Sequence, residues 1–240
     1  EYNYFQFLIE PIIMKQMFHR YLFIGAGIRY NDIFNVEIES DRVNQELIRP
    51  SGFEGSTSLG AEFAVLYDDR DNILNAYEGW YFEFTHGLYD KVLNGTNKFQ
   101  LTRFDLRHYI KMFEDRKDVL AFQFIGHYSH NDVPFSELAL FGSPEILRGY
   151  REGRYVDRHL LAAQTEYRLD FKNTRWGMVG FLGTGDVYND LADFEFQNLR
   201  PNYGVGARFM LDKKERLNIR LDWGFGEKTN NIYLSISEAF

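Results

Sequence analysis

The residues with the clearest potential for chemistry form one arginine-rich segment, from Ile146 to Arg154. It reads Ile-Leu-Arg-Gly-Tyr-Arg-Glu-Gly-Arg, so three arginines lie among glycines that let the backbone turn sharply. The planar guanidinium of arginine binds a carboxylate through two parallel hydrogen bonds. The composition leaves two interpretations open. The segment is a solvated surface loop, or it folds into a polar interior where Arg148 pairs with a buried carboxylate.

Other chemistries find weaker support in the sequence. Ser129 and His130 are a nucleophile and a base of the kind that a phospholipase needs, but adjacent residues of a strand point to opposite faces and cannot pair. The acidic stretch Asp68–Asn72 lacks the spacing and the glycine of an EF-hand, so a turn is favoured. The six histidines show no metal-ligand spacing. We therefore expect no enzymatic activity, no metal and no cofactor.

The elements around these residues are predicted to be strands, because apolar and polar residues alternate with a period of two. In Leu217–Phe225 the odd positions are apolar, while Asn218, Arg220, Asp222 and Gly224 occupy the even ones. In Leu161–Phe171 one face carries Gln164, Glu166, Arg168 and Asp170. Such a charged face does not fit the core of a soluble sandwich. It fits the polar interior of a membrane barrel whose other face meets lipid.

We count about 11 segments of strand length, near the 9–11 residues that a membrane-spanning strand needs. They lie at approximately 4–14, 18–31, 57–69, 78–90, 97–113, 117–131, 158–172, 175–188, 201–213, 215–226 and 230–240. Short connections alternate with long ones, and the long connection 132–157 holds the arginine-rich segment. The fold predicted is an all-β transmembrane antiparallel β-barrel, with residues 1–240 as one barrel domain.

The composition supports this fold and excludes others. The mean hydropathy is -0.40, and no stretch approaches the roughly 20 apolar residues of a transmembrane helix. The chain nevertheless holds 23 Phe and 16 Tyr among 240 residues, and aromatic residues favour strands. The net charge of -8 argues against nucleic acid as a partner.

The alternation of short and long connections also makes a prediction about the start of the barrel. If the last strand ends on the short-turn side, the first visible strand begins on the long-loop side. A single-chain barrel starts and ends on the same side with an even number of strands. We therefore expect an odd number of strands before Glu1. The sequence also shows no secretory signal at its start.

Four short motifs, in order along the chain, resemble those of the BamA/TamA-like outer-membrane proteins, the bacterial surface antigen family. Leu147-Arg148-Gly149-Tyr150 resembles the family's (Val/Ile/Leu)-Arg-Gly-(Phe/Tyr) signature. The other three are Asp68-Asp69-Arg70-Asp71-Asn72 with the following Gly79, Gln164-Thr165-Glu166-Tyr167-Arg168, and Ser237-Glu238-Ala239-Phe240. The resemblance covers most of the chain and is firmest from Ser58 onward.

The resemblance implies a role for the arginine-rich loop. In the family the loop arginine is held inside the barrel by acidic residues, so Arg148, with Gly149 and Tyr150 beside it, is expected to pair with Glu166. A second partner is usually the Asp of a Phe-x-Asp-x-Gly motif one strand later. Here Gly183 stands at that position, and Asp186 has the opposite parity. We therefore expect the Glu166 contact and not the second one.

The last ten residues, Asn231 to Phe240, are predicted to be the strand that closes the barrel. The apolar residues Ile232, Leu234, Ile236 and Phe240 share one face by parity. A lipid-facing strand with a terminal aromatic resembles the recognition signal read by the barrel-assembly machinery. The simpler interpretation is a plain lipid-facing strand, and one surface can serve both purposes.

The resemblance implies a complete barrel of about 16 strands, or about 12 in a smaller form. The function implied is insertion of outer-membrane proteins or translocation of polypeptide in the bacterial cell outer membrane. The expected partners are outer-membrane lipid and lipopolysaccharide, client outer-membrane proteins and other envelope subunits. Two alternatives stay open: a barrel that anchors, or forms a pore for, a fused or associated partner, and a passive diffusion channel.

Overall fold

The computed structural model describes residues 2–38, 51–91 and 95–240. The alternating segments form a single large antiparallel sheet with polar side chains on one face. Its strands are β1 (Tyr2–Ile9), β2 (Ile12–Gln16), β3 (Leu22–Ile38), β4 (Ser56–Asp68), β5 (Gly79–Tyr89), β6 (Phe99–Lys111), β7 (Val119–Asn131), β10 (His159–Asp170), β11 (Trp176–Tyr188), β12 (Arg200–Asp212), β13 (Leu217–Gly226) and β14 (Thr229–Ile236).

Short elements also lie in the described parts of the connections. Between β7 and β10 lie η2 (Phe135–Glu137), β8 (Ala139–Leu140) and β9 (Val156–Asp157), and between β11 and β12 lie η3 (Leu191–Asp193) and η4 (Phe196–Asn198). Within the described ranges no helix is long and apolar enough to cross a membrane.

The sheet follows the chain, with each strand beside the next in the order β1-β3-β4-β5-β6-β7-β10-β11-β12-β13-β14. β2 also pairs with β3, so β1 and β2 together occupy one position in the sheet. They are separated at Glu10 and Pro11, where proline lacks the N–H that a continuous ladder needs. The predicted strands and their antiparallel arrangement are thus confirmed with three differences: this proline breaks the first segment, β3 continues to Ile38 instead of ending at residue 31, and the last strand ends at Ile236.

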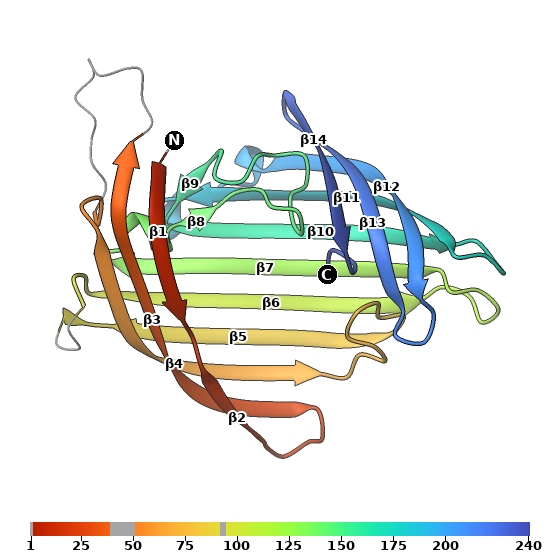
Figure 1. Ribbon diagram of the computed structural model, residues 1–240, viewed down its shortest axis with the longest axis horizontal. Coiled ribbons are helices and arrows are strands. Elements are labelled where there is room, and N and C mark those ends of the chain that lie inside the picture. Colours follow the sequence, from red (N-terminus) through yellow and green to blue (C-terminus); the bar gives the residue numbers. More distant parts are fainter. Residues whose placement is uncertain (1, 39–50, 92–94) are drawn as a thin grey trace.

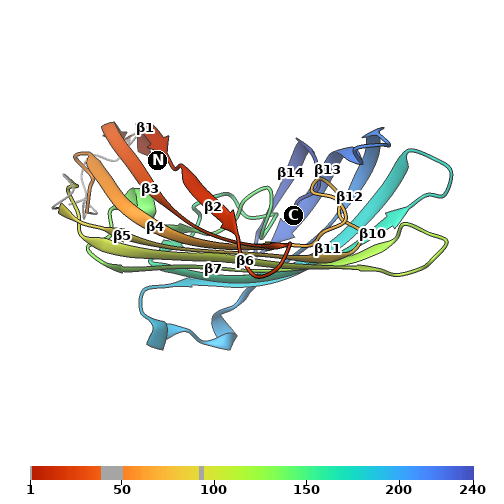
Figure 2. The same cartoon turned by 90° about the horizontal axis from the view of Figure 1, so that it is seen from below.

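The sheet is strongly curved, and both of its ends bend toward the same side (Figures 1 and 2). We call the hollow on the concave side the lumen. Among the described strands, β1 and β14 do not pair with each other, so the sheet is an open trough. The connection from residue 132 to 157, here called the inward loop, crosses the lumen between the two ends of this trough (Figure 1).

The two faces of the sheet differ sharply in chemistry. On β12 and β13 the convex face exposes Tyr203, Val205, Leu221 and Trp223, while Arg208 and Asp222 are buried on the concave face. Apolar residues outside and charged residues inside are the reverse of a soluble protein. They match a barrel wall between lipid and a polar lumen.

The chain beyond β14 departs from the prediction. The strand ends at Ile236, and Ser237 adopts a φ of 80°, which turns the next residues inward. Ile232, Leu234 and Ile236 are 68, 75 and 61% exposed on the convex face, whereas Phe240 is only 7% exposed. The prediction that Phe240 shares their face is therefore wrong. The physical reason is that Glu238 turns in to bond Arg208 and Asn218, and Phe240 packs in a cluster with Tyr109.

Candidate functional site

The centre of the candidate site is the Leu147–Tyr150 segment of the inward loop, whose four residues are all buried in the lumen. Its backbone turns tightly, with a φ of 56° at Leu147 and 106° at Gly149. A Cβ added to Gly149 would lie 2.6 Å from the backbone N and C atoms of Phe225 on β13. Glycine is required at this position both for the conformation and for the close backbone approach.

Arg148 is fully buried and contacts three different strands. Its Nη1 donates to Asp222 Oδ2 of β13 at 2.6 Å, and its Nη2 donates to Glu166 Oε1 of β10. The guanidinium also lies over the ring of Phe181 on β11, with Cζ 3.6 Å from the ring centroid. The interpretation as a solvated surface loop is therefore wrong for Ile146–Tyr150, while Arg151, Glu152 and Arg154 are exposed. The predicted contact between Arg148 and Glu166 is present.

A second carboxylate does hold Arg148, but it comes from an unexpected strand. Gly183 provides none, and a Cβ there would lie 2.7 Å from Asn202 Oδ1. Asn202 uses its amide to donate to the Arg148 carbonyl oxygen at 3.0 Å, and Asp186 pairs instead with Arg200. Asp222, two strands further along, takes the place of the missing aspartate. Alternation had predicted that Asp222 faces inward, but nothing in the sequence indicated that Arg148 reaches it.

The contacts of Arg148 belong to a larger buried network of charges. Glu166 Oε2 also accepts from Arg168 Nε at 2.9 Å. Asp222 also accepts from Arg208 and Arg220, and Arg208 Nε in turn donates to Glu238 at 2.7 Å. Each carboxylate of this network is thus shared by at least two cationic or polar donors. Such sharing is what makes the burial of several charges tolerable.

The same loop segment is bonded to the inner face of β14. Tyr233 Oη accepts a hydrogen bond from Gly149 N at 3.0 Å and donates one to the Tyr150 carbonyl oxygen at 3.2 Å. Asn231 Nδ2 donates to the Gly149 carbonyl oxygen at 3.0 Å. Parity placed Tyr233 on the face opposite Ile232, but its contact with the loop was not predicted. The loop thereby supports the strand from inside, while the apolar face of the strand points outward.

Tyr150 fixes the loop to the connection that precedes β14. Its hydroxyl donates to the Pro201 carbonyl oxygen at 2.8 Å and accepts from Glu227 N at 2.9 Å. Its ring lies so close to Gly226 that a Cβ there would be 2.6 Å from two ring carbons. The ring of Phe141, in the same loop, packs edge-on against it at 4.9 Å. Both the hydroxyl and the ring of Tyr150 therefore hold the loop in place.

The contacts of the site hold the inward loop against the strands of the wall. Across the residues that the structure describes, no three His, Asp or Glu side chains are grouped to hold a metal ion. The buried carboxylates instead face arginines. What the site can do chemically is make and break a set of charge-assisted hydrogen bonds that link the inward loop to β10, β13 and β14.

Comparison with known proteins places this site in a family. The sequence profile of the Omp85 superfamily domain matches residues 22–240. No curated protein matches the chain. A similar fold is found in the crystal structure of BamA from Haemophilus ducreyi lacking POTRA domains 1-3, with a TM-score of 0.66 and 14% sequence identity. The similarity covers 90% of this chain and 51% of that one, so the chain spans about half the length of that structure. Since the superfamily domain matches nearly the whole described sheet, the chain belongs to the Omp85 superfamily.

Proposed function

We propose that this chain is the membrane-embedded wall of a bacterial outer-membrane protein that inserts other outer-membrane proteins or translocates polypeptide, with β14 as its moving part. Membership of the Omp85 superfamily and the fold shared with BamA support this kind of role. The clients are unfolded outer-membrane proteins or other polypeptides. Lipid and lipopolysaccharide meet the convex face, and other envelope subunits assist.

The observation that carries the proposal is the way in which β14 is held. Among the described strands it pairs only with β13, along the eight residues from Thr229 to Ile236. Its inner face is held by side-chain hydrogen bonds from Asn231 and Tyr233 to the inward loop. The bonds that Asn231 and Tyr233 make to the loop are few and local, so breaking them displaces β14 from the loop without unfolding the rest of the wall. We therefore infer that a client segment enters at β14.

Client insertion into liposomes tests the proposal. The complete protein is reconstituted, a urea-unfolded outer-membrane protein is added, and its folding is followed by the mobility shift between heated and unheated samples. We expect faster folding of the client than with protein-free liposomes. We also expect a slower rate when Arg148→Met is introduced, since the loop no longer fixes the resting position of β14. Equal rates with and without the protein would contradict the proposal.

The second candidate function is an anchor or pore without insertase activity. The lumen contains a cavity of about 350 Å³ lined by charged residues such as Glu10 and Asp105 and by apolar ones such as Phe104 and Leu140. An internal chamber is a feature of pores. The insertion assay discriminates between the two candidates. An anchor or pore folds stably in the liposome but leaves the folding rate of the client unchanged.

A further inference from the structure

The inward loop has a second attachment, at the opposite end of the trough from Arg148. Glu137 ends the short helix η2 and is 3% exposed. Its Oε1 accepts from Arg29 Nη1 at 2.7 Å and from Asn31 Nδ2 at 2.6 Å, and both donors lie on β3. The sequence motifs do not include this attachment. It is a buried ion pair in which the loop supplies the anion and the wall the cation. In the Arg148 attachment the loop supplies the cation.

Neighbouring contacts show that the first part of the loop belongs to the β1–β3 end of the trough. The ring of Phe135 packs edge-on against Tyr4 of β1, with the centroids 5.6 Å apart. The Phe135 amide also donates to the Ser51 carbonyl oxygen at 2.9 Å. The inward loop therefore connects the second strand in sheet order, β3, to the last two, β13 and β14.

The two attachments differ in how easily they can be broken. Arg148 is fully buried between two carboxylates and a ring. The Glu137 attachment lies beside the lumen cavity, whose lining includes Glu10 and His127. Arg29 Nε also donates to Glu10 Oε2 at 3.0 Å, so Arg29 keeps a counter-ion when Glu137 leaves. Release at Glu137 therefore avoids the largest penalty, an unpaired buried arginine.

We propose that Glu137 and Arg29 form a releasable second anchor, and that the inward loop is a strap that restrains β14 from the far wall of the lumen. The two anchors act in series, so opening either one weakens the connection that the inward loop makes between β14 and β3. The contacts of Phe135 with Tyr4 and Ser51 remain when Glu137 is released. The restraint itself follows from contacts in the resting structure. Its use during client insertion rests on the function proposed above, and two separate measurements distinguish the two claims.

The restraint is tested by distances between spin labels in the complete protein in liposomes. This chain contains no Cys, so labels are placed at Leu234→Cys on β14 and Phe63→Cys on β4, two exposed positions on the convex face. We expect a narrow distance distribution for the parent. A broader one, shifted to longer distances, is expected for Glu137→Ala and for Arg148→Met.

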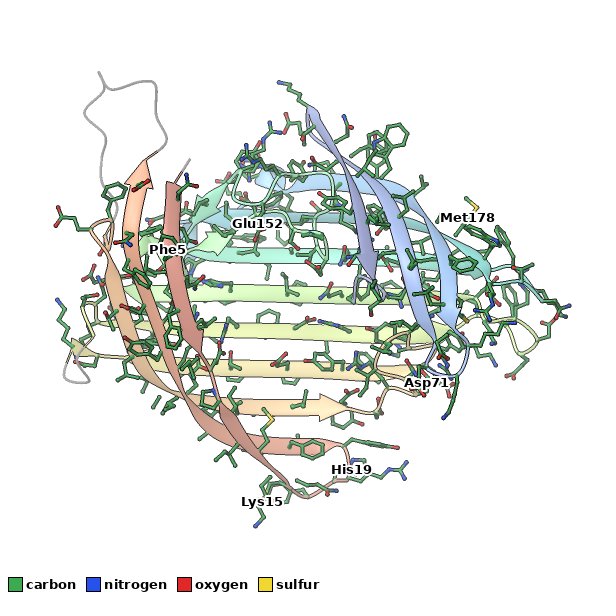
Figure 3. All side chains as sticks on the ribbon, in the orientation of Figure 1. Phe5, Lys15, His19, Asp71, Glu152 and Met178 are labelled. Atoms are coloured by element: carbon green, nitrogen blue, oxygen red, sulfur yellow. The ribbon has the colours of Figure 1, made fainter. Side chains whose placement is uncertain are left out.

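The matched control is Glu152→Gln, an exposed carboxylate of the same loop that Figure 3 shows on the loop segment above the lumen. We expect it to leave the distribution unchanged. If Glu137→Ala fails to fold, Glu137→Gln provides the same comparison with a side chain of equal size. A parent-like distribution for the Glu137 variant overturns the second anchor, whatever Arg148→Met does.

Release of the Glu137 anchor during client insertion is tested by a crosslink that keeps the anchor closed. Cysteines replace Asn31 and Glu137 and are bridged by a short bifunctional thiosulfonate reagent that reductant removes. We expect the bridged protein to lose client insertion and the reduced protein to recover the rate of the double-cysteine variant that was never bridged. Full insertion by the bridged protein overturns release at this anchor. The two claims can also fail separately. If Glu137→Ala changes the label distance but the protein does not accelerate client insertion, the strap is supported and the proposed function is rejected.

Discussion

At the scale of single residues, removing Arg148 and removing Asp222 have unequal effects on the buried ion pairs. If Arg148 is removed, Glu166 keeps Arg168, and Asp222 keeps Arg208 and Arg220. If Asp222 is removed, Arg148, Arg208 and Arg220 lose a shared anion at once. Among the described residues, only Glu166, Glu238 and the exposed Glu145 are then left to pair with these three arginines and with Arg168. An unpaired buried charge is far more costly than a pair replaced by neutral groups. Asp222 is thus the residue on which the network depends most.

This difference predicts which of two substitutions lowers the stability more. Both replace the side chain with one of similar size. Asp222→Asn is expected to lower the free energy of unfolding by about 3–5 kcal/mol, and Arg148→Met by less, because only the former leaves buried arginines short of an anion. The temperature at which the folded mobility is lost on unheated gels measures both. Glu152→Gln is the control. Equal losses for the two variants would show that the arginines are compensated by other means.

Part of this network was predictable from the sequence, and the rest was not. Alternation placed Glu166 and Asp222 on the polar face, and the family motif selected Glu166. Neither selects Asp222, which lies two strands beyond Gly183, as a partner of Arg148. A period of two within one strand carries no information about distances across a lumen. The substitution at Gly183 was visible, but the side chain that replaces its function was not.

At the scale of elements, β14 and the inward loop form one unit. Tyr233 makes two hydrogen bonds to the loop backbone, and Tyr150 binds the connection that leads into β14. The strand boundaries were largely predictable because each wall strand alternates cleanly. Three differences remain: the break at Pro11, the end of β3 at Ile38 instead of residue 31, and the end of β14 before Ser237. At Pro11 and Ser237 one residue changes the backbone, through a missing N–H in the first case and a left-handed φ in the second.

This unit predicts the effect of removing one hydroxyl. Tyr233→Phe leaves the buried Gly149 amide without its acceptor, a loss of about 1–3 kcal/mol. We expect faster hydrogen–deuterium exchange in peptides that cover Glu145–Glu152 and in those that cover β14. Tyr203→Phe, at an exposed tyrosine on the convex face, is the matched control. Unchanged exchange in Tyr233→Phe would mean that the loop does not hold β14.

At the scale of the whole molecule, the trough is crossed at both of its open rims. The inward loop joins β3 to β13 and β14 on the long-loop side. On the short-turn side the connection after β4, with Asp71 labelled in Figure 3, reaches the turn after β12. There Arg216 Nη1 donates to Asp71 Oδ2 at 2.5 Å. Phe240 packs against Ala76 and Tyr77 of the same connection. The wall of strands was predictable from the sequence. The contacts across the lumen were not, because they join residues far apart in the chain, and periodicity is a property of one strand at a time.

The crossing loop predicts how the complete protein conducts ions. The inward loop occupies the lumen, so the parent is expected to show small conductance in a planar bilayer. Deleting residues 143–154 removes the Arg148 attachment and should produce larger and less steady currents. A large, steady conductance in the parent that the deletion leaves unchanged would instead support a passive channel.

The most direct test of the central claim, that clients enter at β14, is site-specific photocrosslinking during insertion. A photoreactive amino acid is placed at Leu234 on β14 and, as the matched position, at Leu182 on β11, both of which are exposed on the convex face. A radiolabelled unfolded client is then added to the reconstituted complete protein. We expect client crosslinks at Leu234 and few at Leu182. Crosslinks of equal yield at both positions, or none at Leu234 while insertion proceeds, would contradict it.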